Sequence, residues 1–250
     1  MSEHGEGISR RGLLNRISLG AATVTVAAAT SGNALAAVAK DSQVHYAMVL
    51  DTRRCIGCHA CSVACKTEFA VPLGATRSWV EYVEKGTYPN VSRHFLPRLC
   101  NHCRNPQCVN VCPTGATFKR SEDGIVVVDK EICIGCKYCI QACPYDVRFI
   151  HPDTGAADKC DFCLHRVSRG VAPSCVNTCQ GKARIFGDMN DPTSEVAQMI
   201  ATNPVTVLRQ GMGTRPSVFY IAADHSDPRE TRIPNQYVRV DTHRRIQERR

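Results

Sequence analysis

Short apolar runs set the pattern of the chain, and two of them lead directly into cysteine-rich loops. These two runs are residues 47–50 and 125–128. A few consecutive apolar residues bounded by turn residues are typical of a strand. Residues 214–221 have the pattern of a turn followed by another strand. We therefore expect a strand before each of two cysteine loops and a third one close to Val218.

The most extended apolar stretch lies near the N-terminus, from Ile17 to Thr30, and is only mildly hydrophobic. Arg10 and Arg11 precede it, and two small-x-small sites within residues 34–39 follow it. This order predicts a signal peptide over residues 1–39, and the adjacent arginines favour the twin-arginine route. The alternatives are a chance arginine pair on an ordinary secretory signal and an N-terminal anchor. No stretch of about 20 strongly apolar residues follows, so we expect no membrane span in the mature part.

Export as a folded protein affects how the cysteines are interpreted. A periplasmic location normally favours disulfides. Twin-arginine export, however, carries proteins that fold, often with a cofactor, in the cytoplasm. We therefore expect a periplasmic protein, held at the outer face of the cytoplasmic membrane, whose thiolates have bound metal before export.

The composition limits the class of protein. The chain has 250 residues, of which 43% are hydrophobic and 22% are charged. This composition excludes a disordered chain, and the length fits one large domain or two small ones. The chain has 16 cysteines, but it is too long, and cysteine is too dilute in it, for a small disulfide scaffold.

All 16 cysteines fall into four groups of four. Groups one and three have the spacing C-x2-C-x2-C-x3-C, group two has C-x2-C-x4-C-x3-C, and group four has C-x2-C-x11-C-x3-C. In chain order the groups are Cys55, Cys58, Cys61 and Cys65; Cys100, Cys103, Cys108 and Cys112; Cys133, Cys136, Cys139 and Cys143; and Cys160, Cys163, Cys175 and Cys179. A run of three closely spaced cysteines with a fourth before a proline, as at Cys143-Pro144, is the bacterial ferredoxin pattern for [4Fe–4S] clusters.

Other uses of these cysteines fit the spacing less well. A zinc site usually takes two C-x2-C pairs, so a ladder of three cysteines leaves one ligand unused. Group four taken alone is compatible with zinc. Disulfides between cysteines only three residues apart have poor geometry. We therefore interpret all four groups as iron ligands.

An internal repeat supports this interpretation and indicates how the groups combine. Residues 51–58 align with residues 129–136, and Gly57 and Gly135 take equivalent places between the first two ligands of groups one and three. In two-cluster ferredoxins the fourth cysteine of a run binds the other cluster. Pairing group one with four, and two with three, gives sites A to D. Site A is Cys55, Cys58, Cys61 and Cys179; site B is Cys160, Cys163, Cys175 and Cys65; site C is Cys100, Cys103, Cys108 and Cys143; site D is Cys133, Cys136, Cys139 and Cys112.

The charge of the molecule fits this hypothesis. The formal net charge is +8, and four thiolate-ligated clusters of net negative charge would offset about that much. We therefore do not take the basic excess as a nucleic-acid surface. The arginine-rich tail, residues 239–250, is interpreted as a solvated tail, with docking to a partner or to anionic lipid as the alternative.

Two further features have both a structural and a functional interpretation. Residues 66–99 contain the single tryptophan, Trp79, and several other aromatic residues, which either pack an insertion or dock a partner. His59, His102 and His165 lie within the cysteine groups. Since four cysteines suffice for each cluster, we expect these histidines to form hydrogen bonds near the clusters or to be exposed.

The sequence shows no catalytic motif. It contains no G-x-S-x-G, no P-loop and no complete dinucleotide fingerprint, and every cysteine is already assigned. We therefore expect that the chain is not an enzyme on its own and that it conducts electrons.

Residues 46–194 resemble the iron–sulfur (beta) subunits of the dimethyl sulfoxide reductase family of molybdopterin oxidoreductases. The pieces that carry the resemblance include Leu-Cys-Asn-His-Cys at 99–103, Ala-Cys-Pro-Tyr at 142–145 and Asp-Lys-Cys-Asp-Phe-Cys at 158–163. Within the family, the beta subunits of tetrathionate reductases are the most similar, followed by those of polysulfide, thiosulfate and arsenate reductases. The resemblance implies the same ligand exchange, four [4Fe–4S] clusters, a molybdopterin catalytic subunit facing site A, and a polytopic quinol-oxidising membrane subunit.

The expected fold is α+β, with two ferredoxin-like modules in residues 40–194, an insertion at about 66–99 and a C-terminal extension over 195–250. The expected function is electron transfer between a quinol-oxidising membrane subunit and a periplasmic molybdopterin reductase of tetrathionate, polysulfide or thiosulfate. The alternative is electron transfer in a periplasmic hydrogenase or multihaem nitrite reductase system. A free-standing ferredoxin fits less well, because of the signal peptide and the long segments without cysteine.

Overall fold

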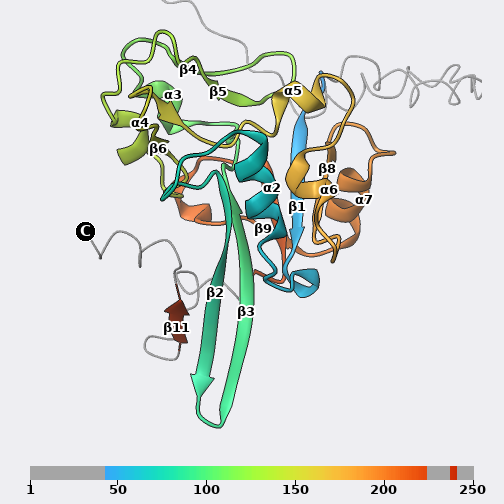
Figure 1. Cartoon of the computed structure of the whole chain (residues 1–250). Helices are drawn as coiled ribbons and strands as arrows, with labels where there is room; N and C mark the ends of the chain where they lie inside the picture. Colours follow the sequence, from blue (N-terminus) through green and yellow to red (C-terminus); the bar gives the residue numbers. More distant parts are fainter. Residues whose placement is uncertain (1–42, 224–236, 241–250) are drawn as a thin grey trace, which may run out of the picture. The chain divides into compact units, whose positions relative to one another are not determined.

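The computed structural model describes residues 43–223 and 237–240 (Figure 1). The predicted signal peptide and residues 241–250 of the arginine-rich tail lie outside the described residues. Within the described part, no helix combines the length and the apolar character that crossing a membrane requires.

A four-stranded sheet lies next to the cysteine loops. Its strands are β1 (Tyr46–Asp51), β8 (Arg184–Asp188), β9 (Val205–Thr206) and β10 (Val218–Ile221), in the order β8-β1-β10-β9. Strand β1 is antiparallel to β8 and parallel to β10. The strands expected at residues 47–50 and close to Val218 are therefore present, and they are neighbours in the sheet.

Strand β1 is buried on both faces because its side chains alternate between two apolar clusters. Met48 and Leu50 join the larger cluster, which also contains several of the cysteines. Ala47 and Val49 join a smaller one, completed by Val196 from α7 (Glu195–Thr202). The start of α7 is fixed by Ser194, whose hydroxyl accepts a hydrogen bond from the amide of Ala197. The sheet thus anchors the first cysteine loop, which begins directly after β1.

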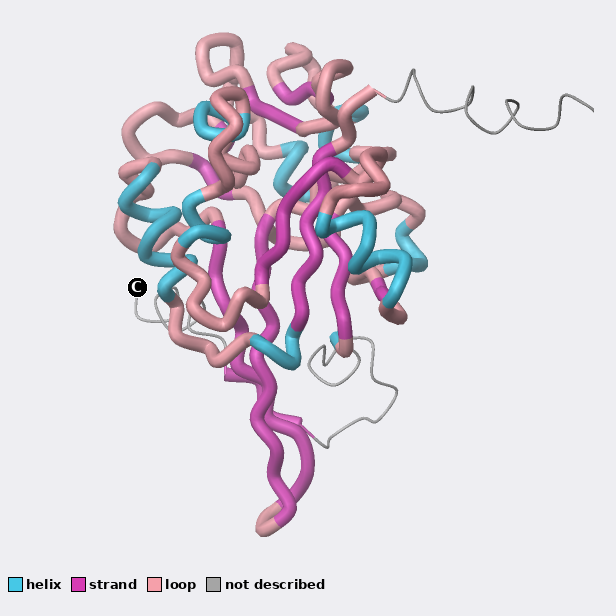
Figure 2. The backbone as a smooth tube through the Cα atoms, turned by 90° about the vertical axis from the view of Figure 1, so that its right-hand side faces the viewer, coloured by secondary structure: helices cyan, strands magenta, loops and turns pink. Residues whose placement is uncertain are grey.

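A long hairpin occupies most of the expected insertion. Strands β2 (Ser78–Thr87) and β3 (Asn90–Leu99) pair over ten positions, and β11 (Tyr237–Val240) pairs with the outer edge of β2. Trp79 and Leu96 are buried at its base, whereas Tyr88 at its tip is 94% exposed. Figures 1 and 2 show the tip extending away from the cysteine loops.

The remaining strands are short and pair locally. Strand β4 (Thr117–Lys119) is antiparallel to β5 (Val126–Val128), and β6 (Phe149–Ile150) is antiparallel to β7 (Ala157–Asp158). The strand expected at residues 125–128 is thus present as β5.

Short helices accompany the cysteine groups. They are η1 (Thr52–Arg54), α2 (Ala60–Glu68), α3 (Gln107–Asn110), α4 (Tyr138–Gln141), α5 (Leu164–Val167) and α6 (Ser174–Asn177), and η2 (Gln210–Met212) precedes β10. Helix α2 contacts α6, and α3 contacts α4. These contacts join group one to group four and group two to group three, and the mixture of helices and strands makes the fold α+β.

Candidate iron–sulfur cluster sites

Each cysteine group opens with the same backbone turn. The residue before the second cysteine has a positive φ in all four groups, at Gly57 (69°), His102 (41°), Gly135 (67°) and Phe162 (56°). A left-handed residue at this position reverses the backbone within one C-x2-C unit, so both thiols of the unit face the same side. The recurrence shows that the four groups share one loop geometry.

Glycine is required at two of these four positions. A Cβ on Gly57 would lie 2.4 Å from the ring of Phe95, and a Cβ on Gly135 would lie 2.5 Å from the carbonyl oxygen of Gly155. Both distances are far inside van der Waals contact, and the positive φ already disfavours a side chain. The two glycines of the sequence repeat therefore let other parts of the chain approach the loops of groups one and three.

The fold brings the cysteines together in the combinations of sites A to D. Three cavities are each lined by four cysteines. One contains Cys55, Cys58, Cys61 and Cys179, a second contains Cys100, Cys103, Cys108 and Cys143, and a third contains Cys112, Cys133, Cys136 and Cys139. In each cavity the fourth thiol comes from a different group than the other three.

Site B is assembled where α2, which carries Cys65, contacts α6, which carries Cys175. Burial, followed by the neighbouring Cys175 and Cys163, raises the pKa of Cys65 to about 12. Burial raises the pKa of Cys160 well above its usual value, and Cys65 and Cys175 add to the effect. Cys65 therefore faces group four rather than the rest of its own group.

The donor set fits a multi-iron cluster. All 16 cysteines are free thiols, and burial is the main reason why the pKa values of Cys103 and Cys163 also rise to about 12. Bound iron would reverse this tendency, since a coordinating metal deprotonates a thiol. In the described part of the chain, no three His, Cys, Asp or Glu side chains lie close enough to hold a single metal ion.

Backbone amides point at thiols of groups two, three and four. The amides of Thr117, Ala157, Phe162 and Ala183 donate to the Sγ atoms of Cys112, Cys133, Cys160 and Cys179 at 3.3–3.4 Å. Such hydrogen bonds stabilise negative charge on sulfur and are one of the factors that set cluster potentials.

The sites differ in their exposure. Cys58 of site A and Cys136 of site D are exposed, whereas all four cysteines of site B are buried. Large apolar side chains are exposed beside the two accessible cysteines, with Ile56 at 59% and Ile134 at 67%. Sites A and D therefore reach the surface through apolar rims.

The three histidines within the cysteine groups have different surroundings. His165 binds Glu68 at 2.7 Å near the surface, and His59 tilts against the ring of Tyr82 at 5.2 Å. His102 is fully buried, and its Nδ1 accepts a hydrogen bond from the amide of Val126 at 3.1 Å. The hydrogen bonds of His102 and His165 agree with the prediction from the sequence, whereas His59 is half-buried and contacts an aromatic ring.

His102 has a further contact that the sequence did not predict. Its ring stacks on Phe162 with centroids 3.7 Å apart. His102 belongs to group two and Phe162 to group four, the two groups in which an aromatic residue replaces the glycine of the repeat. The stack therefore joins the loops of sites B and C. The signal in the sequence that could have predicted this contact is that glycine stands at this position in two groups and an aromatic ring in the other two.

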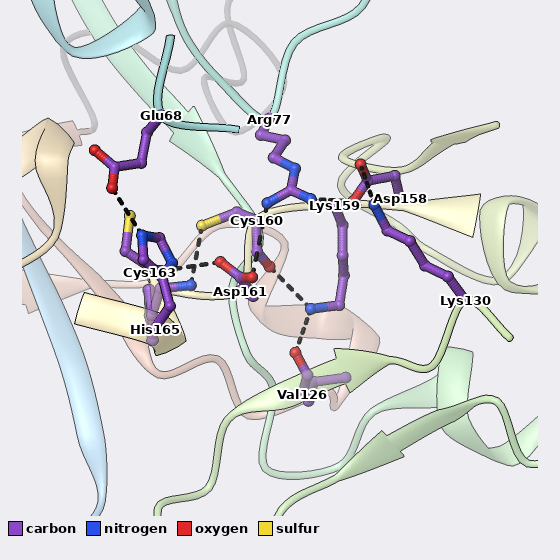
Figure 3. A network of polar contacts seen from close by, with 11 residues as sticks. Glu68, Arg77, Val126, Lys130, Asp158, Lys159, Cys160, Asp161, Cys163 and His165 are labelled. Carbon is purple, nitrogen blue, oxygen red and sulfur yellow. Dashed lines mark hydrogen bonds and ion pairs between the residues drawn. The ribbon is translucent and has the colours of Figure 1, made fainter. Parts of the chain in front are cut away.

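A network of polar contacts includes Cys160 and Cys163 of site B (Figure 3). Lys159 is buried, and its ammonium group donates to the carbonyl oxygens of Val126 and Cys160. Arg77 forms a buried ion pair with Asp158 at 2.6 Å. Sequence reasoning missed both cations, because Lys and Arg in a sequence are normally taken as solvent-exposed.

The fold and these thiol sets define an iron–sulfur protein of the ferredoxin type with paired cluster modules. Two models described as a 4Fe-4S dicluster domain match the sequence, over residues 54–116 and 91–189. These matches support [4Fe–4S] clusters as the cofactors.

Curated relatives identify the family. The B subunit of tetrathionate reductase from Salmonella typhimurium is 52% identical over 72% of this chain and 73% of its own length. A protein NrfC homolog of Haemophilus influenzae is 45% identical over 80% of this chain and 91% of its own. The B subunit of polysulfide reductase from Wolinella succinogenes is 41% identical over 70% and 93%. The protein therefore belongs to the iron–sulfur (beta) subunits of the dimethyl sulfoxide reductase family.

Proposed function

We propose that the chain is an electron-transfer subunit carrying four [4Fe–4S] clusters, one in each of sites A to D. The observation that supports it most is the assembly of all 16 cysteines into four sets of four. Each cluster supplies one-electron redox chemistry when bound. The protein's part is to hold the clusters close together, bury the inner ones and leave the outer ones accessible. On this proposal the chain catalyses no reaction alone.

The neighbouring thiols indicate a serial order from A to D. Cys61 of site A raises the pKa of Cys175 of site B, after the larger effect of burial. Burial and then other thiols raise the pKa of Cys160 of site B, and Cys100 of site C is among them. Helix α3, which carries Cys108 of site C, contacts α4, which carries Cys139 of site D. Because each site thus adjoins the next and only A and D have an exposed cysteine, electrons would enter at one end and leave at the other.

The exposed ends are the places where partners would dock. We infer that a molybdopterin catalytic subunit covers site A and that a polytopic quinol-oxidising membrane subunit covers site D. The apolar rims at Ile56 and Ile134 suit such interfaces, since interface cores are depleted of charge. The twin arginines at 10–11 support a periplasmic location, which cell fractionation would check.

The names of the relatives suggest the class of substrate. Tetrathionate and polysulfide appear in the names of two relatives that resemble this chain, so a reductase of tetrathionate, polysulfide or thiosulfate is the leading candidate for the whole complex. The NrfC proteins are almost as similar. This similarity supports a second candidate function, that of an electron-transfer subunit in a periplasmic hydrogenase or multihaem nitrite reductase system.

An anaerobic pull-down of the tagged full-length chain from its host membranes tests this function. We expect a molybdopterin subunit together with a polytopic membrane protein, and the catalytic partner would name the substrate. A hydrogenase large subunit or a multihaem cytochrome would support the second candidate. Recovery of the chain alone, with clusters that quinol-dependent electron flow does not reduce, would contradict both.

A further inference from the structure

Two buried arginines occupy equivalent places in the two halves of the cysteine pattern. Arg148 follows Cys143 by five residues (148 − 143), and Arg184 follows Cys179 by five (184 − 179). Both cysteines are the last of their group, and each lines the cavity of a site built mainly from another group. The two arginines thus share one position relative to the exchanged ligand.

Arg148 lies against site C. Its Nη2 donates to the Sγ of Cys108 at 2.9 Å, and its Nη1 donates to the hydroxyl of Thr117 at 3.3 Å. The side chain lines the cavity of site C and is only 6% exposed. Burial by itself would lower its pKa, but the thiols of site C together with Cys139 of site D outweigh burial and raise it. One guanidinium therefore faces two sites.

Arg184 takes the corresponding place between sites A and B. It lines the cavity of site A, and its Nη2 donates to the hydroxyl of Ser78 at 2.9 Å. Its charged neighbours include Cys61 of site A and Cys175 of site B, and these thiols raise its pKa against the effect of burial. Its Nη1 is buried without a hydrogen-bond partner in the described part of the chain.

The counter-charges distinguish this pair from the other buried arginines. Arg77 pairs with Asp158 and Arg98 with Glu81. In the described residues, neither Arg148 nor Arg184 has a carboxylate within ion-pair distance. A buried cation without an anion is strongly unfavourable. The negative charge that balances each of them must therefore come from the thiolate-ligated sites it faces.

We propose that Arg148 and Arg184 are charge-compensating residues that each bridge two cluster sites and raise the reduction potentials of both. The proposal rests on the proposed function, because it takes the cysteine sets as cluster sites. Reduction adds one electron, and therefore one negative charge, to a cluster. A fixed positive charge a few ångströms away in a buried setting favours that reduced state. Arg184 acts on sites A and B, and Arg148 acts on sites C and D.

The test is a dithionite redox titration of the full-length, cluster-loaded protein followed by electron paramagnetic resonance. Removing the charge with Arg184→Gln should change the reduced-to-oxidised ratio of clusters A and B at least tenfold at a given potential. For a one-electron couple this is a lowering of about 59 mV. The reduction potentials of clusters C and D should not change. Arg148→Gln should lower the reduction potentials of clusters C and D and leave those of clusters A and B unchanged. Ligand variants Cys55→Ser and Cys133→Ser assign the signals to the two halves.

The matched control is Arg169→Gln, which removes the same charge from an exposed position after α5. Solvent and salt screen an exposed charge, so its effect should be far smaller. Equal shifts for the control and the buried variants, or equal shifts of all four clusters, would overturn the proposal. So would unmoved potentials in a variant with full iron content.

Charge-retaining variants keep the test decisive if the glutamine variants lose their clusters. Arg184→Lys and Arg148→Lys should keep the iron and keep the potentials near those of the parent protein. A lysine variant that holds its clusters but shifts tenfold, or that loses iron as well, would show that charge is not what these positions supply. The parent protein tests the underlying assignment separately, because fewer than four clusters in it would contradict the proposed function instead.

Discussion

The backbone turn shared by the four cysteine groups is filled by two kinds of residue. At sites A and D the left-handed position is a glycine, and other parts of the chain come within contact of it. At sites B and C it is Phe162 or His102, and the two rings stack. A single position in the loop therefore determines whether a site packs against the rest of the fold or against its neighbouring site.

The substitution Gly57→Ala tests this at site A. The positive φ of 69° costs a side chain about 1–2 kcal/mol, and the clash with Phe95 adds about 1–3 kcal/mol of overpacking. Gly170→Ala is the matched control, since its φ is 73° and nothing lies within 4 Å of the new Cβ. Thermal unfolding should show the larger loss for Gly57→Ala. Equal losses of stability in the two variants would mean that the close approach of Phe95 does not require glycine at position 57.

At the scale of elements, the hairpin and the helices hold the cysteine loops from outside. The base of β2 reaches the loop of site A, where the hydroxyl of Tyr82 donates to the carbonyl of Gly57 at 2.8 Å. The ring of Tyr82 packs edge-on against Phe95 at 5.2 Å. The aromatic residues of the expected insertion are thus mostly internal at its base, and Tyr88 is the exposed one.

Removing only the hydroxyl isolates the contribution of the hairpin. Tyr82→Phe should lower stability by about 0.5–1.5 kcal/mol, since one hydrogen bond is lost while the ring packing stays. Tyr88→Phe, at a position 94% exposed, should leave the melting temperature unchanged. If both variants melt like the parent protein, the hairpin does not support the loop through this bond.

Glu68 joins three helices around site B and gives the fold a pH dependence. It accepts hydrogen bonds from Ser174, His165 and Arg166, and these bonds, that of Ser174 first, lower its pKa from 4.5 to about 2. A carboxyl whose pKa is lower in the folded state stabilises the fold above its unfolded pKa. The contribution should be complete at pH 7, should shrink below about pH 4.5 and should vanish near pH 2.

Melting temperatures of the parent protein and Glu68→Gln between pH 7 and pH 4 measure this contribution. The parent should melt higher at pH 7, and the difference should narrow toward pH 4. Glu131→Gln, at an exposed position, serves as the control and should show no such trend. A difference that stays constant with pH would rule out the ionised Glu68 as its source.

At the scale of the whole molecule, several positively charged side chains are buried in the interior. The basic excess was expected to offset the clusters, and the structure places part of it in the core, at Arg77, Arg148, Lys159 and Arg184. Two of these, Arg148 and Arg184, face the cysteine sets without a carboxylate of their own in the described residues. Part of the positive charge of the molecule therefore lies in the core, beside the cysteine sets.

The sequence was sufficient for what depends on short spacing. Thiols three residues apart belong to one loop whatever the rest of the molecule does, so the cysteine groups could be predicted, as could the strands that precede groups one and three. The pairing of β1 with β10, 170 residues apart (218 − 48), could not, since register between distant strands depends on tertiary packing. The buried arginines could not be predicted for the same reason, because the residues that they contact lie far away in the sequence.

The central claim is that the last cysteine of each group serves a neighbouring site. Electron paramagnetic resonance of the dithionite-reduced protein tests it by comparing Cys61→Ser, Cys65→Ser and Cys160→Ser. The account predicts that Cys65→Ser and Cys160→Ser change the same cluster signal, that of site B, and that Cys61→Ser changes a different one. If Cys65→Ser instead changes the same signal as Cys61→Ser, each group closes on its own cluster and the account is wrong.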